Sequence, residues 1–175
     1  MPKPQLTQII SVIRDPMLSD NFIMEFPNVP TGGNDETNLL VSCQQTVKPG
    51  MTINEVQVQL FGHTLVYAGN LTYSHDMQIT FVENARGSIM RTFEKWGELA
   101  RGHLTQHGVP SADYWRTGKL SILDTKGDPV LIYNIVGMWP NTVPDVQFDG
   151  TNANGINHSI GFKYQYYELV GGSAQ

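Results

Sequence analysis

One stretch of this sequence, residues 83–104, carries the repeat of an amphipathic helix, while the segments on either side alternate as β-strands do. Its apolar side chains recur at i, i+4, i+7 and i+11 and so form one stripe: Ile89, Phe93, Trp96 and Ala100, widened by Met90 and Leu99. Asn84 is a suitable N-cap, and Glu83 complements the positive end of the helix dipole. Glycines inside the stretch each cost about 1 kcal/mol relative to alanine. We therefore expect this helix to depend on packing against a sheet.

The side of the helix away from the stripe is charged, and we expect it to face solvent: it carries Arg91, Glu94, Lys95, Glu98 and Arg101. The formal charge of the whole chain is −5, and it is unevenly spread. Residues 86–126 hold seven basic and four acidic residues, whereas the remainder holds four basic and twelve acidic ones. This distribution fits an ordinary solvated face, and it also fits two oppositely charged surfaces for two partners.

Outside the helix, polar and apolar residues alternate with the period of β-strands. The clearest case is residues 55–61, with one face of Val56, Val58 and Leu60 and an opposite face of Glu55, Gln57 and Gln59. We expect further strands at residues 21–26, 39–47, 77–81, 119–125, 130–138, 144–148 and 159–166, with turns at Pro49-Gly50 and at 126–129. Together these elements predict a mainly β protein, an antiparallel β-sandwich or split barrel with one packed α-helix.

The length of 175 residues suits a single domain over residues 1–175. We expect a short N-terminal arm over residues 1–20, in which residues 6–13 favour a brief helix, and a flexible C-terminal tail over 171–175. No secretory signal and no membrane-spanning apolar run is found. The sequence therefore predicts a chain that folds in a reducing cytoplasm.

Patterns that carry chemistry are weak. His103 and His107 have the spacing of helix-borne metal ligands, but flanking glycines interrupt the helix and no H-E-x-x-H motif is present. The loop at 149–155 lacks the first acid and the closing Glu of a calcium loop. The single cysteine, Cys43, has no partner for an intrachain disulfide and suits a buried apolar position. We expect no metal, no cofactor and no enzymatic activity.

Two runs of sequence are more informative. The first, AGNLTYSHDMQITFVENA at residues 68–85, leads into the helix that bears Phe93 and Trp96. The second, GMWPNTVPDVQFDGTNANGINHSIGFKYQYYEL at residues 137–169, closes the chain. Both resemble the tail tube protein of contractile-tailed bacteriophages of the T-even type, which has an A-G-x-x-T-aromatic stretch, a G-L-W-P turn and an aromatic-rich last strand in this order. The resemblance begins near Leu60, and the segments at 32–38 and 107–116 depart from the family pattern.

The resemblance implies a structural virion protein. Proteins of that family form six-fold rings that stack into a hollow tube, in which the inner sheets of neighbours join and through which DNA is ejected inside a contractile sheath. The implied partners are further copies of the chain, the sheath protein, the baseplate and tail terminator proteins, and DNA that passes without specific binding; no membrane is implied. The implied location is the tail tube of the virion, after assembly in the host cell cytoplasm.

On this basis we expect three assembly surfaces. Ring stacking is expected at a protruding hairpin or loop of residues 46–54, through Val47, Lys48, Pro49, Gly50, Met51 and Thr52. The lumen is expected to be lined by polar strand faces, through Glu55, Gln57, Gln59, Lys163 and Gln165. The sheath is expected to contact the helix through Arg91, Glu94, Lys95, Glu98 and Arg101.

The lumen residues also predict a charge for the channel. A wall of like charge keeps DNA from adhering, and Glu55 is the leading candidate to supply it. Asp145 and Asp149 are further candidates that also fit ring junctions. Lys163 opposes the idea, so we expect a neighbouring carboxylate to neutralise it.

Two other functions stay open on the sequence alone. A monomeric β-sandwich module would bind a ligand such as carbohydrate on a stacking platform of Tyr114, Trp115 and Trp139. The tube of a type VI secretion system or another phage-like particle would share the fold, and the sequence does not separate it from a phage tail.

Overall fold

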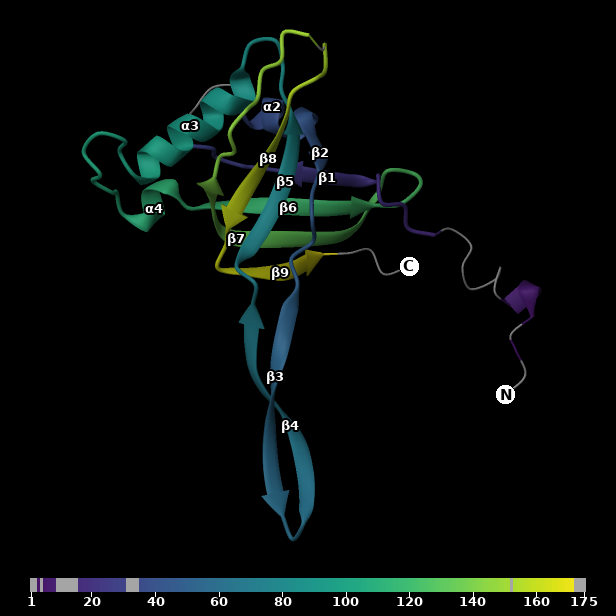
Figure 1. The fold of residues 1–175 in the computed structure, drawn as a ribbon. Helices are drawn as coiled ribbons and strands as arrows, with labels where there is room; N and C mark the ends of the chain where they lie inside the picture. The colour runs from purple at the N-terminus through teal and green to yellow at the C-terminus, as the bar shows by residue number, and fades with distance from the viewer. Residues whose placement is uncertain (1–2, 4, 9–15, 31–34, 152, 172–175) are drawn as a thin grey trace.

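The computed structural model describes residues 3, 5–8, 16–30, 35–151 and 153–171 (Figure 1). Its elements in chain order are β1 (Phe22–Glu25), α2 (Asp35–Ser42), β2 (Cys43–Gln45), β3 (Met51–Leu60), β4 (His63–Tyr73), β5 (Asp76–Val82), α3 (Ser88–Ala100), α4 (Ser111–Tyr114), β6 (Arg116–Leu123), β7 (Pro129–Thr142), β8 (Asn157–Lys163) and β9 (Tyr166–Gly171). Residues 6–8 are helical. The rest of the helix expected at 6–13 and the tail beyond 171 lie outside the described residues.

Strand β7 belongs to two antiparallel sheets and joins them into one split barrel. The first sheet has the order β1-β6-β7-β9 and the second has the order β7-β8-β5-β2. β7 bends at Gly137, where φ is 71° and a Cβ atom would lie 2.6 Å from Cγ of Gln165. Next to this bend the chain passes from β8 in the second sheet to β9 in the first, and Gln165 N–H donates to Val136 O at 2.9 Å. The predicted fold class is confirmed.

The core lies between the two sheets and consists of inward-facing side chains of β1, β5, β6, β7 and β8 together with those of α2 and α3. In β5 and β8 every second residue is buried, as the alternation predicts: Met77, Ile79 and Phe81, and Ile160 and Phe162. Phe162 contacts three other rings, one just after β1 and two in α3, with centroids 5.7 Å from Phe26, 5.6 Å from Phe93 and 6.2 Å from Trp96. Each fully buried side chain of this size contributes about 1.5–3 kcal/mol.

Helix α3 covers one open side of the barrel with the predicted stripe. Ile89, Phe93 and Trp96 are fully buried, and the indole N–H of Trp96 donates to Tyr114 O at 2.7 Å. The helix is shorter than the predicted 83–104 and begins after Gly87, which has a φ of 65°. Gly87 therefore occupies the N-cap position in place of the predicted Asn84, although Asn84 Oδ1 still accepts Ser88 N–H of the first turn at 3.3 Å.

Four predicted strands differ from the structure. Residues 39–47 form the end of α2 and the short β2, because the run Leu39-Leu40-Val41 has no period and only Leu39 is buried. β7 continues past Pro140, which is tolerated because this half of β7 pairs with β8 alone. Residues 144–148 form no strand, and the last strand divides into β8 and β9 at residues 164 and 165.

Candidate functional site: the assembly surfaces

The hairpin of β3 and β4 projects from the barrel as a separate arm (Figure 1). Every residue of β3 is exposed, and in β4 only Gly69 and Tyr73 are partly buried. The strands turn at Phe61 and Gly62, whose φ angles of 50° and 80° have the signs of a type I′ turn. A two-stranded hairpin is at best marginally stable alone in water, so this arm is suited to contact with other chains.

The outer half of the hairpin has one apolar and one polar face, because residues directly opposite each other share a face. Val56, Val58 and Leu60 pair with Tyr67, Leu65 and His63, respectively, which gives the apolar face. Glu55, Gln57 and Gln59 pair with Ala68, Val66 and Thr64 on the other face. The predicted alternation over 55–60 is thus confirmed, and Gln57 Nε2 donates to Glu55 Oε1 at 2.8 Å.

A β-bulge at Gly69 exchanges these faces in the half nearer the barrel. Glu55 pairs with Ala68 but Ile53 pairs with Leu71, so β4 contains one extra residue at this point. As a result Ile53 and Met51, which lie on the same side of β3 as Glu55, pair with Leu71 and Tyr73. The apolar surface therefore changes side halfway along the arm. A Cβ atom on Gly69 would lie 2.8 Å from Asn54 O, which explains the glycine.

The residues expected to form the stacking loop do not form a protruding turn. Residues 46–50 are an extended connection along the barrel, with Pro49 buried, and Met51 and Thr52 already belong to β3. Nζ of Lys48 lies 5.3 Å from the ring centroid of Tyr133 and 5.1 Å from that of Tyr167, and both rings border the core. The expectation of a hairpin at Pro49-Gly50 is wrong in position, and the arm has its tip at Phe61-Gly62 instead.

The outer face of the second sheet is polar. Asp76, Gln78 and Thr80 of β5 pair with Lys163, Gly161 and Ser159 of β8. Lys163 Nζ and Asp76 Oδ1 form an ion pair, so a carboxylate does neutralise this lysine. Gln165 does not share that face, because the chain turns into the first sheet and its side chain packs over Gly137.

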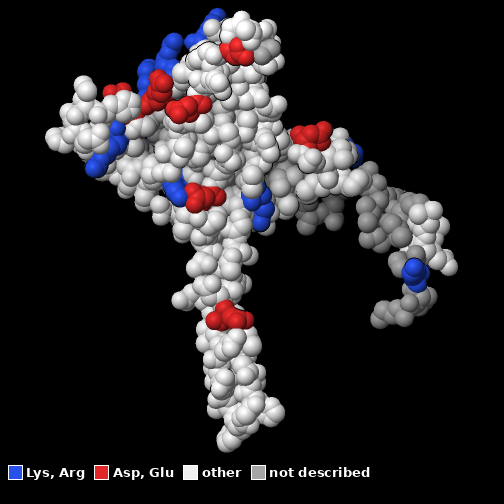
Figure 2. Space-filling model, viewed as in Figure 1, with Lys and Arg blue, Asp and Glu red and all other residues white. Residues whose placement is uncertain are grey.

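The charged side of α3 faces solvent, as expected from its position opposite the stripe. Arg91, Glu94, Lys95, Glu98 and Arg101 are all exposed. In Figure 2 charged side chains of both signs gather over this region at the upper left, whereas the arm below shows a single acidic group. That group is Glu55, since residues 51–73 contain no other Asp, Glu, Lys or Arg.

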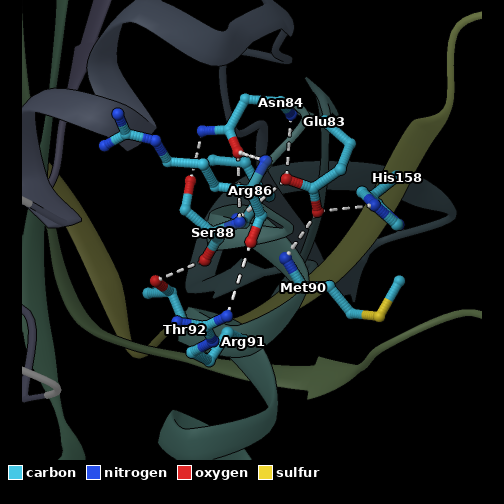
Figure 3. A network of polar contacts seen from close by, with 9 residues as sticks. Glu83, Asn84, Arg86, Ser88, Met90, Arg91, Thr92 and His158 are labelled. Carbon is cyan, nitrogen blue, oxygen red and sulfur yellow. Dashed lines mark hydrogen bonds and ion pairs between the residues drawn. The ribbon is translucent and has the colours of Figure 1, made fainter.

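A buried carboxylate holds the N-terminus of α3 (Figure 3). Glu83 accepts hydrogen bonds from Ile89 N–H at 3.1 Å and Met90 N–H at 2.8 Å, and from His158 Nε2 of β8 at 3.0 Å. The side chains of Glu83 and His158 are only 6% and 1% exposed. Burial alone would raise the pKa of Glu83, but the backbone N–H donors and the charge of His158 outweigh it and lower that pKa overall.

Comparison with known proteins identifies the family. A family model described as phage tail tube protein matches residues 13–170. The chain belongs to the phage tail tube protein family. No curated protein sequence matches it. The subunit is therefore a structural component of a tail tube, and its fold is one that other tube-bearing particles share.

Three solved structures show this tail tube fold. A chain in the sheath–tube complex of PVC, an extracellular contractile injection system in its extended state, has a TM-score of 0.64 at 10% identity, over 95% of this chain and 99% of that one. A chain in the baseplate of the anti-feeding prophage has a TM-score of 0.60 at 16% identity, over 89% and 96%. A chain in the cap that terminates the tube of the same particle has a TM-score of 0.59 at 13% identity, over 89% and 91%.

The remaining candidates from the sequence are an aromatic platform, a metal site and the single cysteine. The rings of Trp115 and Trp139 stand at 80° and 86° to Tyr114, so the three do not form a flat platform for a sugar. Among the described residues no three His, Cys, Asp or Glu side chains come together as a metal site. No helix within those ranges is long and apolar enough to cross a membrane. Cys43 is half-buried, and burial raises its pKa to about 11, so its thiol stays protonated.

Proposed function

We propose that this tail tube protein assembles into six-fold rings that stack into a hollow tube, the conduit for DNA ejection inside a contractile sheath. The observation that carries the proposal is the arm of β3 and β4, an amphipathic hairpin whose two strands pair only with each other among the described strands. Its apolar side chains, such as Val56, Leu65 and Tyr67, are about half exposed. A second copy of the chain has apolar surface of the same kind, and contact between the two copies removes the apolar surface of each from water.

The open edges of the barrel support lateral joining of copies. Within the described residues β1, β2 and β9 each pair with one neighbour only. Exposed strand edges attract further strands, and soluble proteins usually block them. Closing the edges between neighbouring copies in a ring satisfies their backbone N–H and C=O groups.

For the lumen we propose the polar outer face of the second sheet together with Glu55. DNA carries one charge per roughly 1.7 Å of duplex axis, so a basic channel would hold it at many points. The ion pair with Asp76 offsets the positive charge of Lys163, and Glu55 adds a negative charge. An assembled tube whose inner surface is net positive would contradict this assignment.

For the outer surface we propose α3, with the sheath gripping its charged side. Structures similar to this chain come from a sheath–tube complex, a baseplate and a tube-terminating cap, which supports the sheath, the baseplate and a terminator protein as partners. The proposed location is the tail of a virion, after assembly in the host cytoplasm. A second candidate, the tube of a phage-like injection particle, is favoured by the same matches. Capsid and portal genes beside this one would identify a phage tail.

Electron microscopy of the purified chain tests the proposal. We expect hollow tubes with six subunits per turn or ring when the chain is concentrated or incubated with sheath and baseplate proteins. In a matched variant, Asn-Gly replaces residues 56–67 and joins the cross-strand pair Glu55 and Ala68. This variant should fold with the same circular dichroism spectrum and form no tubes. A wild-type chain that stays monomeric under all these conditions would refute the tube.

A further inference from the structure

Phe61 at the tip of the arm is both exposed and strained. Phe61 is 99% exposed, the highest value among the large apolar residues that the structure describes. Its φ of 50° lies in the left-handed region, which is a genuine outlier for a bulky residue. A type I′ turn strongly prefers Asn, Asp or Gly at this position. An aromatic residue here raises the energy of the isolated hairpin, so its use has to lie in a contact outside the chain.

A pocket of about 310 Å³ lies at the end of the molecule opposite the tip. It is formed by the loop between β7 and β8, within residues 145–149 and 154–157. Figure 1 shows this yellow-green loop above the barrel and the arm below it. Phe148, one of the lining residues, is 73% exposed. An engineered cavity of about 150 Å³ already holds benzene, so the pocket has room for one aromatic ring.

We propose that Phe61 of one copy seats in the pocket beside Phe148 of the next copy, stacked head to tail. The inference rests on the proposed tube and names the contact between its successive rings. Because the tip and the pocket are different surfaces at opposite ends, the contact is heterologous and repeats without closing. Such a repeat builds a stack along the direction of the arm.

Charge and ring geometry agree with this pairing. The tip carries His63 and no acidic residue between 56 and 67, whereas Asp145 and Asp149 line the pocket. Offset or edge-to-face contact between two phenylalanine rings adds about 0.5–1.5 kcal/mol beyond the area buried. Asp149 Oδ1 also accepts Thr151 N–H at 2.9 Å, which fixes the loop at the pocket's edge.

Disulfide crosslinking within assembled tubes tests the contact. On a Cys43→Ser background, Phe61→Cys is combined with Gln147→Cys in the pocket wall, and in a control with Glu94→Cys on exposed α3. A disulfide requires Cα atoms within about 7 Å. We expect oxidised Phe61→Cys/Gln147→Cys tubes to run as a ladder of trimers, tetramers and longer species on a non-reducing gel. The control should give at most dimers.

The two failures are distinguishable. The Phe61→Cys/Gln147→Cys variant is assembled at a concentration high enough to offset the loss of the Phe61 side chain. Tubes of this variant that give no ladder would overturn this contact, although the proposed tube itself would still be supported. A ladder from the control instead would place the tip against α3 of a neighbour. Absence of wild-type tubes refutes the proposed function, and this contact with it.

A second variant separates folding from assembly. Phe61→Asn installs the preferred Asn-Gly turn, so the isolated chain should be as stable as wild type or slightly more stable. Loss of an aromatic anchor typically weakens an interface strongly, so the critical concentration for tube assembly should rise about tenfold or more. If Phe61→Asn assembles at the wild-type concentration, Phe61 is not the anchor.

Discussion

Glu83, just after β5, and His158, on β8, form a buried hydrogen-bonded pair at 3.0 Å, and the carboxylate of Glu83 also holds the first turn of α3. One carboxylate thus connects the end of β5, the start of α3 and strand β8. It lies at the end of the molecule that carries the loop between β7 and β8. It has a direct consequence for stability, because hydrogen bonds to a buried charged group are worth more than neutral ones.

Glu83→Gln keeps the size of the side chain and removes its charge. Loss of charge-assisted bonds of this kind should lower the free energy of unfolding by about 2 kcal/mol. For a chain of this length the melting temperature should then fall by about 4–8 °C. Glu94→Gln, on the exposed side of the same helix, is the control and should melt as wild type does.

The same residue predicts a pH dependence. The pKa of Glu83 in the folded chain lies below its ordinary value of 4.5, so its contribution is complete above pH 4.5 and disappears as the pH falls through the folded value. Wild-type stability should therefore fall more steeply below pH 4.5 than that of Glu83→Gln. Parallel curves for the two proteins, measured by urea unfolding, would show that Glu83 is not responsible.

Gly69→Ala tests the bulge in the arm. The added methyl would lie 2.8 Å from Asn54 O and 2.9 Å from Val56 Cγ2, so the register of the hairpin has to shift. Because the arm lies outside the core, the melting temperature should change by no more than a degree or two, while tube assembly fails. Gly50→Ala is the matched control, since nothing lies within 4 Å of its added Cβ, and it should assemble normally.

Lys48→Met tests the connection into the arm. Its ammonium group lies over Tyr133 and Tyr167, and loss of such an exposed cation–π contact should destabilise the subunit by about 0.5–1 kcal/mol. Lys126→Met in the β6–β7 turn should have no effect. A Lys48→Met subunit of unchanged stability that no longer forms tubes would instead support a direct role of Lys48 between rings.

Charge reversal on α3 tests the sheath contact. The triple variant Arg91→Glu, Lys95→Glu and Arg101→Glu changes only exposed side chains. Tubes should form as before, whereas sheath should polymerise on them more slowly, and raising the salt concentration should reduce the difference. Normal sheath assembly on the triple variant at low salt would exclude this side of α3 as the docking surface.

The buried alternation of β5 and β8 follows from the sequence because a strand covered on one face must place an apolar residue at every second position. The same argument predicts the stripe Ile89, Phe93 and Trp96. It fails for α2, since Leu39-Leu40-Val41 has no period of either kind and acidic Asp35 and Glu36 are the only signal of a helix start.

The sequence predicts a protruding hairpin but places its turn at the wrong residues. Pro49-Gly50 is the stronger turn signal by residue type, whereas the structure turns at Phe61-Gly62. The signal that identifies the true tip is a two-residue break with Gly second, between two alternating runs that pair as Leu60 with His63. The trace of the bulge in the sequence is Gly69 itself, an isolated glycine inside a strand pattern, but the change of register depends on pairing between strands.

The arm and the loop between β7 and β8 lie at opposite ends of the molecule. The arm ends in the exposed ring of Phe61, whereas the loop forms a pocket. In the proposed head-to-tail stack all copies point the same way, so the stack has a direction. One terminus of the assembly always presents bare hairpins, and the other always presents bare pockets. A protein that initiates the tube and a protein that terminates it would therefore bind different surfaces, one the hairpins and the other the pockets. Each of them has to be complementary to only one end of the tube.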